Sequence, residues 1–390
     1  MLAITNGRIY TITQGILPRG DILVENGKIV AIGTGLPVPS GATVVDATGK
    51  YVFPGFVEAH GHAGVMEDGF GWEGRDGNEL TDPVTAHVRA IDAINPEEQG
   101  LRDAVEGGVT TLWSTPGSGN VIGGDGVTIK THGRGRTVDE MIIKYPSGLK
   151  AAMGENPKRV YGNQKKMPST RMGVAGVMRE ALAKGQNYLQ KMKRAAEDPE
   201  KPFERDLKME AIARVLRREI PLRVHAHRAD DIMTAVRIAE EFNIEITIEH
   251  CTEGHKVADE LAKRGIRAVV GPSLTARSKV ELRDRTLLTP LVLAKAGVEF
   301  AIMTDHPVIP IQYLPFSAAL AVREGLDEEI ALRAITINAA AIAGVADRVG
   351  SLEVGKDADI VVWSDHPFEL MSRVLVTIVD GQVVYQREEV

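Results

Sequence analysis

The chain has 390 residues, of which 43% are hydrophobic and 25% are charged, and 53 acidic against 46 basic side chains give a net charge of -7. This is ordinary globular composition with enough apolar residues for a large core, and the mild acidity argues against a nucleic-acid partner, which would need a basic face. Cys251 is the single cysteine, which excludes an internal disulfide and a cysteine-based zinc site.

The start of the chain lacks the basic end and the long apolar stretch of a signal peptide. No apolar run in the sequence is long enough to span a bilayer. We therefore expect a cytoplasmic protein with no membrane partner.

The two ends of the chain are typical of β-structure. Residues 1–53 contain short alternating patterns around Asn6-Gly7 and a hairpin signal at Asn26-Gly27, and residues 352–390 contain a similar turn at Asp380-Gly381. Isolated hairpins are marginal in water, so neither end is expected to fold alone. The sequence predicts one small β-sandwich domain built from residues 1–53 plus 352–390.

Residues 54–351 alternate between short apolar strands and helical patterns. This alternation indicates an α/β fold with a parallel sheet and crossover helices, and eight strands suit a closed (β/α)8 TIM-like barrel. The link at residues 116–126 is too short for a crossover helix, so either one strand is misassigned or this region is a hairpin. The expected strands are residues 56–60, 110–115, 127–132, 149–155, 222–227, 245–250, 267–273 and 299–306.

Histidines and acids recur where these strands end. His60 and His62 are two residues apart, so an extended backbone directs both side chains to one face, and His225 and His227 repeat this spacing. In a parallel barrel, the carboxyl ends of the strands meet at the face where ligands bind. The other strand-end candidates are Glu155, His250 and Asp305.

These donors are expected to share a cation. Burying an unpaired imidazole or carboxylate is costly, and a metal ion would supply the common partner. Imidazole and carboxylate ligands without thiolates suit zinc, manganese, iron or cobalt.

The order of these motifs resembles the amidohydrolase superfamily, and within it the imidazolonepropionase-like and uncharacterised amidohydrolase group. The resemblance is carried by PGFVEAHGH at residues 54–62, the later histidines and aspartate, and TINAAAIAGVADRVGSLEVGKDADIVVW at residues 336–363. It implies a hydrolase that acts on a carbon–nitrogen bond of a small amide or cyclic amide. It also implies two divalent metal ions, with zinc as the first choice, and a homo-oligomer.

When the metal ligands of the family are matched to this sequence by position, the resemblance implies that His60 and His62 hold a buried metal together with Asp305. His225 and His250 would hold a more exposed one. Many members use a carbamylated lysine as the bridge between the metals. Here two residues compete for that place: Glu155, which we favour at the strand end, and Lys150, which we expect deeper in the barrel and facing the opposite way.

His227 is an alternative to His225 as the ligand on the fifth strand, or else a contact to substrate. The implied mechanism is attack by a metal-bridging hydroxide on the substrate carbonyl. Asp305 would act as general base and then as general acid toward the leaving nitrogen.

Three further residues are candidates for substrate binding. His132 could polarise a carbonyl or could be an ordinary solvated histidine. Arg159 and Arg228 could bind a substrate carboxylate as a fork, or could pair with Asp230 and other acids at the rim.

Two rival interpretations remain open. The first is a mononuclear deaminase or imidazolonepropionase-type ring hydrolase that uses His60, His62, His227 and Asp305. The second is an inactive homologue that serves as a scaffold or binding protein. Metal content separates the first rival from the main hypothesis, because the main hypothesis requires two ions per chain.

Overall fold

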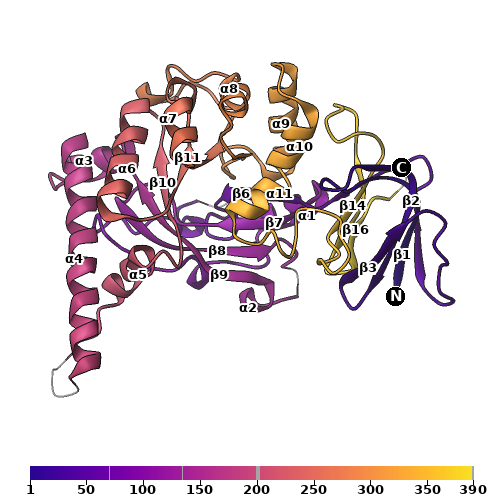
Figure 1. Ribbon diagram of the computed structural model, residues 1–390, viewed down its shortest axis with the longest axis horizontal. Helices are drawn as coiled ribbons and strands as arrows, with labels where there is room; N and C mark the ends of the chain where they lie inside the picture. The colour runs from indigo at the N-terminus through magenta and orange to yellow at the C-terminus, as the bar shows by residue number, and fades with distance from the viewer. Residues whose placement is uncertain (70, 134, 199–202, 389–390) are drawn as a thin grey trace.

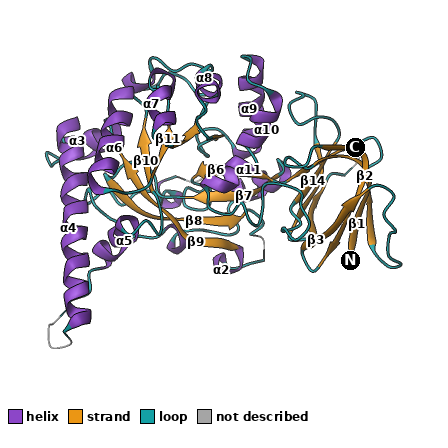
Figure 2. Cartoon of the chain, viewed as in Figure 1, coloured by secondary structure: helices purple, strands orange, loops and turns teal. Residues whose placement is uncertain are grey.

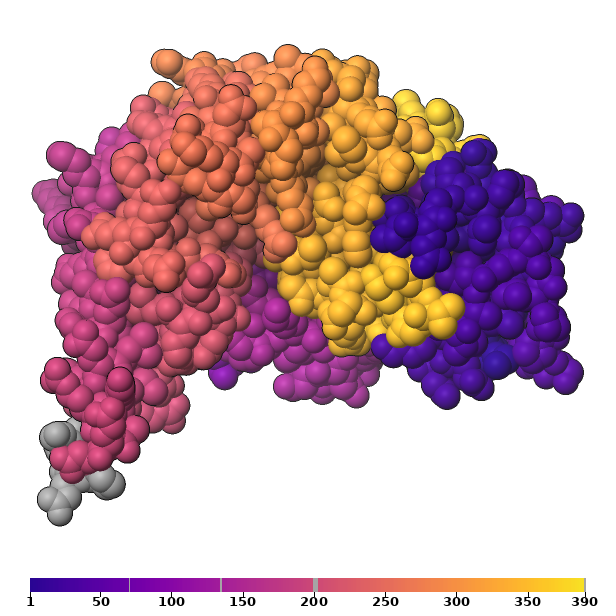
Figure 3. Space-filling model, viewed as in Figure 1, coloured from indigo at the N-terminus to yellow at the C-terminus, as the bar shows by residue number. Residues whose placement is uncertain are grey.

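The computed structural model describes residues 1–69, 71–133, 135–198 and 203–388. Strands and helices form a large α/β body, and a smaller β-domain lies at one end and contains both chain termini (Figures 1 and 2). The space-filling view shows the N-terminal and C-terminal segments, in indigo and yellow, side by side on that flank (Figure 3).

Both ends of the chain contribute strands to the sheet of the small domain. In this sheet β5 pairs antiparallel with β14, which places Val52 opposite Val362. Buried aliphatic side chains, among them Ile4 and Ile360, form a core of its own. The predicted composite β-sandwich is confirmed, whereas its exact boundaries at residues 53 and 352 stay a prediction. The strands are β1 (Leu2–Tyr10), β2 (Ile16–Glu25), β3 (Lys28–Gly33), β4 (Thr43–Asp46), β5 (Tyr51–Pro54), β14 (Ile360–Trp363), β15 (Val374–Val379) and β16 (Gln382–Gln386).

Of the two turns predicted in the N-terminal segment, one forms a hairpin and the other lies inside a strand. Asn26-Gly27 joins β2 to β3, and both residues have a positive φ, as the tight hairpin turn requires. Asn6-Gly7 instead lies inside β1, where the pairing with β2 shifts register. A Cβ atom on Gly7 would lie 2.5 Å from Val52 Cγ2, so a glycine is needed at this bulge.

A second sheet of eight strands forms a nearly closed barrel, with the strands ordered as they follow in the chain. The backbone N–H of His62 donates to His306 O at 2.9 Å and so links the segments after the first and last strands. The barrel prediction is therefore confirmed. The strands are β6 (Phe56–Gly61), β7 (Val109–Ser114), β8 (Ile122–Lys130), β9 (Ile142–Ala152), β10 (Leu222–Ala226), β11 (Ile246–His250), β12 (Arg267–Val270) and β13 (Phe300–Ile302).

One barrel strand runs opposite to the direction that we expected. β8 pairs antiparallel with β7 and β9, with Thr111 opposite Lys130 and Ile122 opposite Ala151. The short link before β8 is therefore a hairpin connection, which needs no crossover helix. As a result, β8 begins at the face where the other strands end and ends at the opposite face.

Helices connect and cover the barrel strands. Between β9 and β10, α4 packs with α5 and carries the chain into a long projection (Figure 1). Neither α4 nor another helix of the described ranges combines the length and apolar character needed to cross a bilayer. The α-helices are α1 (Gln99–Glu106), α2 (Val138–Met141), α3 (Glu155–Asn163), α4 (Arg171–Glu197), α5 (Leu207–Leu216), α6 (Ala229–Phe242), α7 (Ala258–Lys263), α8 (Thr289–Ala296), α9 (Leu314–Arg323), α10 (Glu328–Ala334) and α11 (Ile337–Ile342).

A buried ion cluster joins the barrel to the small domain. Lys130, at the end of β8, places its Nζ 2.7 Å from Asp359 Oδ2, 3.0 Å from Asp357 Oδ2 and 3.3 Å from Asp380 Oδ1. Burial alone would lower the pKa of Lys130, but the three carboxylates raise it overall. The reversed direction of β8 places this lysine at the barrel end that faces the C-terminal strands.

We expect Lys130→Met to lower the free energy of unfolding by about 3–5 kcal/mol, because the buried carboxylates lose their shared cation. Urea denaturation of the variant and the parent protein measures this difference. The control is Lys184→Met, which removes an exposed pair with Glu180 and should have little effect. Equal stability of the two variants would contradict a structural role for the cluster.

Candidate metal centre

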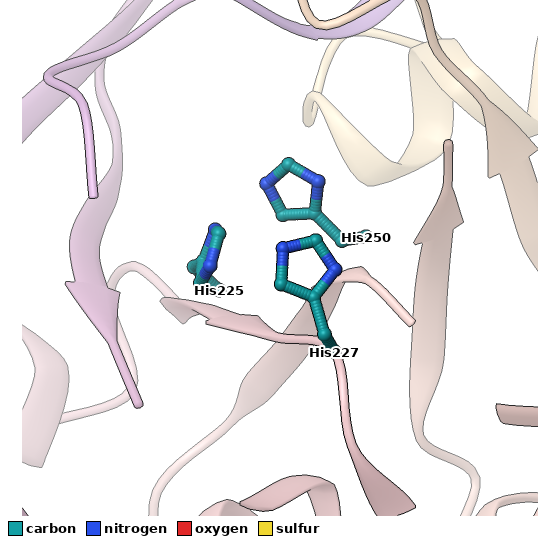
Figure 4. A group of neighbouring side chains, drawn as sticks. All are labelled: His225, His227 and His250. Carbon is teal, nitrogen blue, oxygen red and sulfur yellow. The ribbon is translucent and has the colours of Figure 1, made fainter. Parts of the chain in front are cut away.

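Two groups of buried donor side chains meet at the face of the barrel where its parallel strands end. One consists of His60, His62 and Asp305, and the other of His225, His227 and His250. Within each group the potential ligand atoms all lie within 4.8 Å of one another. The rings of the second group gather around a common space in Figure 4.

The two groups are neighbours and share a carboxylate. Asp305 Oδ1 lies 3.3 Å from His62 Nε2 and 3.5 Å from His60 Nε2. Its other oxygen, Oδ2, lies 4.0 Å from His250 Nδ1. The rings of His60 and His250 have their centroids 5.2 Å apart. The two donor groups therefore lie next to each other.

Hydrogen bonds to one ring nitrogen orient several of the imidazoles. His62 Nδ1 donates to the carbonyl of Thr115 at 2.7 Å, and His227 Nδ1 lies 2.7 Å from Thr252 Oγ1. Such bonds select a tautomer and leave the other nitrogen with a lone pair for a metal.

His60 is held by a longer chain of buried charges. Its Nδ1 donates to Glu249 Oε2 at 2.7 Å, and Glu249 Oε1 accepts from Arg223 Nε at 2.6 Å. The guanidinium of Arg223 lies 3.6 Å from the ring centroid of Trp113. Burial would raise the pKa of Glu249, but Arg223 and His60 outweigh it and lower the pKa to about 2. Glu249 is therefore an anion that fixes the orientation of His60.

Burial keeps four histidines of the two groups neutral. It lowers the pKa of His62, lowers that of His227 to about 3, and, with the neighbouring rings, lowers those of His225 and His250 well below the usual value. Burial would also raise the pKa of Asp305, but the adjacent imidazoles of His60 and His62 lower it overall. Neutral imidazoles and an ionised carboxylate are the forms that bind a metal.

Several buried atoms of these groups have no hydrogen-bond partner among the described residues. They are His225 Nδ1, His227 Nε2 and Asp305 Oδ1. An unpaired buried polar atom costs about 1–3 kcal/mol, so these atoms of the two adjoining groups call for a partner. A divalent cation fits this donor set, which combines imidazole nitrogens with a carboxylate.

The structure places Lys150 in the centre and leaves Glu155 outside both groups. Lys150, on β9, is buried with its Nζ 3.0 Å from His60 Nε2, and burial lowers its pKa to about 8. β9 ends at Ala152, and Gly154, with a φ of 78°, turns the chain so that Glu155 begins α3. Our expectation assumed an extended backbone through Glu155, which does not occur.

Glu155 has different neighbours. Its backbone N–H donates to Glu281 Oε2 at 3.0 Å. Its side chain is half-buried in a separate surface depression that also contains Arg159 and Arg228. Glu155 is thus placed on the outer side of the rim.

The three substrate-binding candidates His132, Arg159 and Arg228 lie in three different parts of the structure. His132 follows β8 and lies at the opposite barrel end, because β8 is antiparallel. Arg228 is bound to the carboxylate of Asp230 through two hydrogen bonds, at 2.8 and 2.7 Å. Arg159 is exposed and lines the cavity above the metal centre.

That cavity has a volume of about 410 Å³ and opens directly onto both donor groups. His62, His225, His227, His250 and Asp305 form its floor, and Asn156 and residues 117–119 form part of the wall. Much of the remaining wall comes from residues 270–289. A space of this size accommodates a small molecule.

Sequence reasoning missed two buried glutamates that support the centre. Glu249 is described above. Glu58 Oε2 accepts from Thr304 N at 2.8 Å and from Thr304 Oγ1 at 2.6 Å, and burial raises the pKa of Glu58 to about 8. The available signal was a charged residue inside an otherwise apolar strand, in FVEAH and EITIEH.

Comparison with known proteins places this architecture in a family. The family model for the amidohydrolase family matches residues 149–385, which is more than half of the chain. A solved structure of an amidohydrolase from Thermotoga maritima MSB8 has 50% sequence identity and a TM-score of 0.96, and the match covers 99% of this chain and 100% of that one.

Two curated relatives are more distant. The amidohydrolase tasK of Hapsidospora irregularis is 30% identical over 388 residues, which covers 93% of this chain and 39% of the relative. An adenine deaminase of Listeria monocytogenes is 25% identical over 396 residues, which covers 98% of this chain and 57% of the relative. The chain therefore spans about half the length of these relatives or less.

We expect Glu249→Gln to weaken metal retention about 10- to 100-fold, since the neutral amide orients His60 less strongly than the carboxylate does. Metal content after dialysis against graded chelator concentrations measures this effect. Glu245→Gln, on an exposed residue just before the same strand, is the matched control. Unchanged metal retention in Glu249→Gln would show that its contact with His60 has no bearing on metal binding.

Proposed function

Because the chain belongs to the amidohydrolase family, we propose that it hydrolyses a carbon–nitrogen bond of a small amide or cyclic amide with two divalent cations. The observation that carries this proposal is the pair of adjoining donor groups, with unpaired buried atoms, at the floor of a cavity. The proposed substrate is a small molecule, and the homo-oligomer expected above remains a prediction.

In this proposal, His60 and His62 hold one cation together with Asp305. His225 and His250 hold the other, and His227 completes that second group as a third imidazole. Zinc suits these ligands best, and iron, manganese and cobalt are the alternatives.

We assign the bridging position to Lys150, as its carbamate, in place of Glu155. The distance of 3.0 Å between Lys150 Nζ and His60 Nε2 supports this assignment, as does the complete burial of the lysine side chain. The neutral Lys150 amine would react with carbon dioxide and release one proton to give the carbamate, a two-oxygen anion that suits a site for two metal ions.

When bound, the cations would polarise the substrate carbonyl and lower the pKa of a water molecule. Asp305 is placed to accept the proton of the attacking water and to deliver it to the leaving nitrogen. Its unpaired Oδ1 lies in the metal centre and the residue lines the cavity, so it reaches both the donors and the substrate space.

A deaminase is the second candidate, and the similarity to an adenine deaminase favours it. It also breaks a carbon–nitrogen bond, but in the form considered above it requires one cation rather than two. Two complete donor groups in one cavity favour the first candidate.

We expect Asp305→Asn to retain most of its metal and to lose about 100- to 10,000-fold in kcat, since the amide cannot accept the proton. The loss is measured as the rate of hydrolysis of a panel of cyclic amides and N-acyl amino acids. Formation of the free amine or of the ring-opened product is monitored. Asp365→Asn is the control, because Asp365 is exposed in the small domain.

The parent protein should hydrolyse at least one member of the panel. Absence of hydrolysis across the panel would contradict the proposed function. Full activity in a metal-loaded Asp305→Asn variant would contradict the role of Asp305 alone.

A further inference from the structure

The cavity above the metal centre has a strongly unequal balance of charge. Three of its lining residues carry a positive charge, Arg159, Lys279 and Arg285, whereas Asp305 is the single acid among the described residues that line it. Asp305 is also the residue that the proposed cations would neutralise. An anionic group on the ligand would therefore be attracted to this space.

Two of these cations belong to the β12–α8 loop, residues 271–288, which forms much of the cavity wall. Arg277 stabilises the loop from its exposed side, where its Nε and Nη2 donate to the carbonyls of Arg283 and Arg285 at 2.9 and 3.0 Å. Arg285 itself donates from Nη1 to the carbonyl of Ser273. These bonds hold Arg285 in the wall of the cavity.

Arg285 is a partly buried cation without an anionic partner. Its Nε is fully buried and makes no hydrogen bond, and within the described ranges its guanidinium forms no ion pair. Burial and the nearby Arg277 lower the pKa of Arg285. The two other cations differ, because Lys279 lies 3.7 Å from Glu281 Oε1 and Arg159 is solvent-exposed at the rim.

We infer that Arg285 binds a carboxylate group of the substrate, so that the substrate is an amide that carries a carboxylate in addition to the bond that is cleaved. A guanidinium presents parallel N–H groups that match the two oxygens of a carboxylate. Arg285 and the donor groups line one cavity of about 410 Å³, so a single small ligand can reach both. This inference rests on the proposed function for the identity of the ligand as an amide.

Arg285 thus takes the role of binding the substrate carboxylate, for which the sequence had suggested Arg159 and Arg228. Arg228 is already bound to Asp230 and does not line the cavity. Among the described residues, Arg285 differs from Arg228 in forming no ion pair and from Arg159 in being partly buried in the cavity wall, and both features depend on the folded loop.

The test measures binding as well as turnover. Isothermal titration calorimetry compares a panel of N-acetyl amino acids with the matching carboxamides, which lack the negative charge. The proteins are the parent holoenzyme, Arg285→Met, Arg285→Lys and the control Arg283→Met. Arg283 belongs to the same loop but is exposed and does not line the cavity.

We expect the parent enzyme to bind at least one acid more than tenfold tighter than its carboxamide. Arg285→Met should weaken binding of that acid about 10- to 100-fold and leave the carboxamide nearly unchanged. Arg285→Lys should recover part of the preference, and Arg283→Met should behave as the parent. Thermal denaturation and metal content verify that each variant is folded and loaded.

Three results would overturn the assignment. They are equal binding or no binding of the acids by the parent enzyme, an unchanged preference in Arg285→Met, and an equal loss for acid and carboxamide in that variant. The expected binding pattern without hydrolysis of any compound would instead count against the proposed function and still support the carboxylate site.

Discussion

Buried imidazole nitrogens and carboxylate oxygens that lack hydrogen-bond partners are costly unless a cation binds them. The carboxyl end of this barrel contains several such atoms, from His225 and His227 in one donor group and from Asp305 in the adjoining one. Burial keeps His62, His225, His227 and His250 neutral, while Asp305 remains ionised. The site is therefore arranged for positive charge from outside the protein, and the rest of the barrel supports that arrangement.

The support comes from fixed charges behind the donors. Glu249 orients His60 and is itself paired with Arg223, so this chain of buried groups is satisfied at each step. The reversed strand β8 does not support the donors. Its end places Lys130 beside Asp357 and Asp359 of the small domain. The composite β-domain is thus joined to the barrel by a charged contact at the end opposite the metal centre.

The histidine pairs could be predicted from the sequence because a two-residue spacing at the end of an extended strand places both side chains on one face. The same reasoning failed for Glu155, since Gly154 turns the backbone before it and Lys150 takes the inner place. His132 lies at the opposite end of the barrel because β8 is antiparallel, and strand direction is not encoded in a short apolar segment. The Glu249–Arg223 pair was missed because contacts across a barrel depend on register between strands that only the fold defines.

In the proposed function the two donor groups bind two cations. Anomalous diffraction at the absorption edge of the bound metal, from crystals of the metal-loaded protein grown with bicarbonate, tests it most directly. We expect two peaks, one beside His60 and His62 and one beside His225 and His250, with additional density on Lys150 between them. A single peak, or an empty space beside His225 and His250, would contradict it.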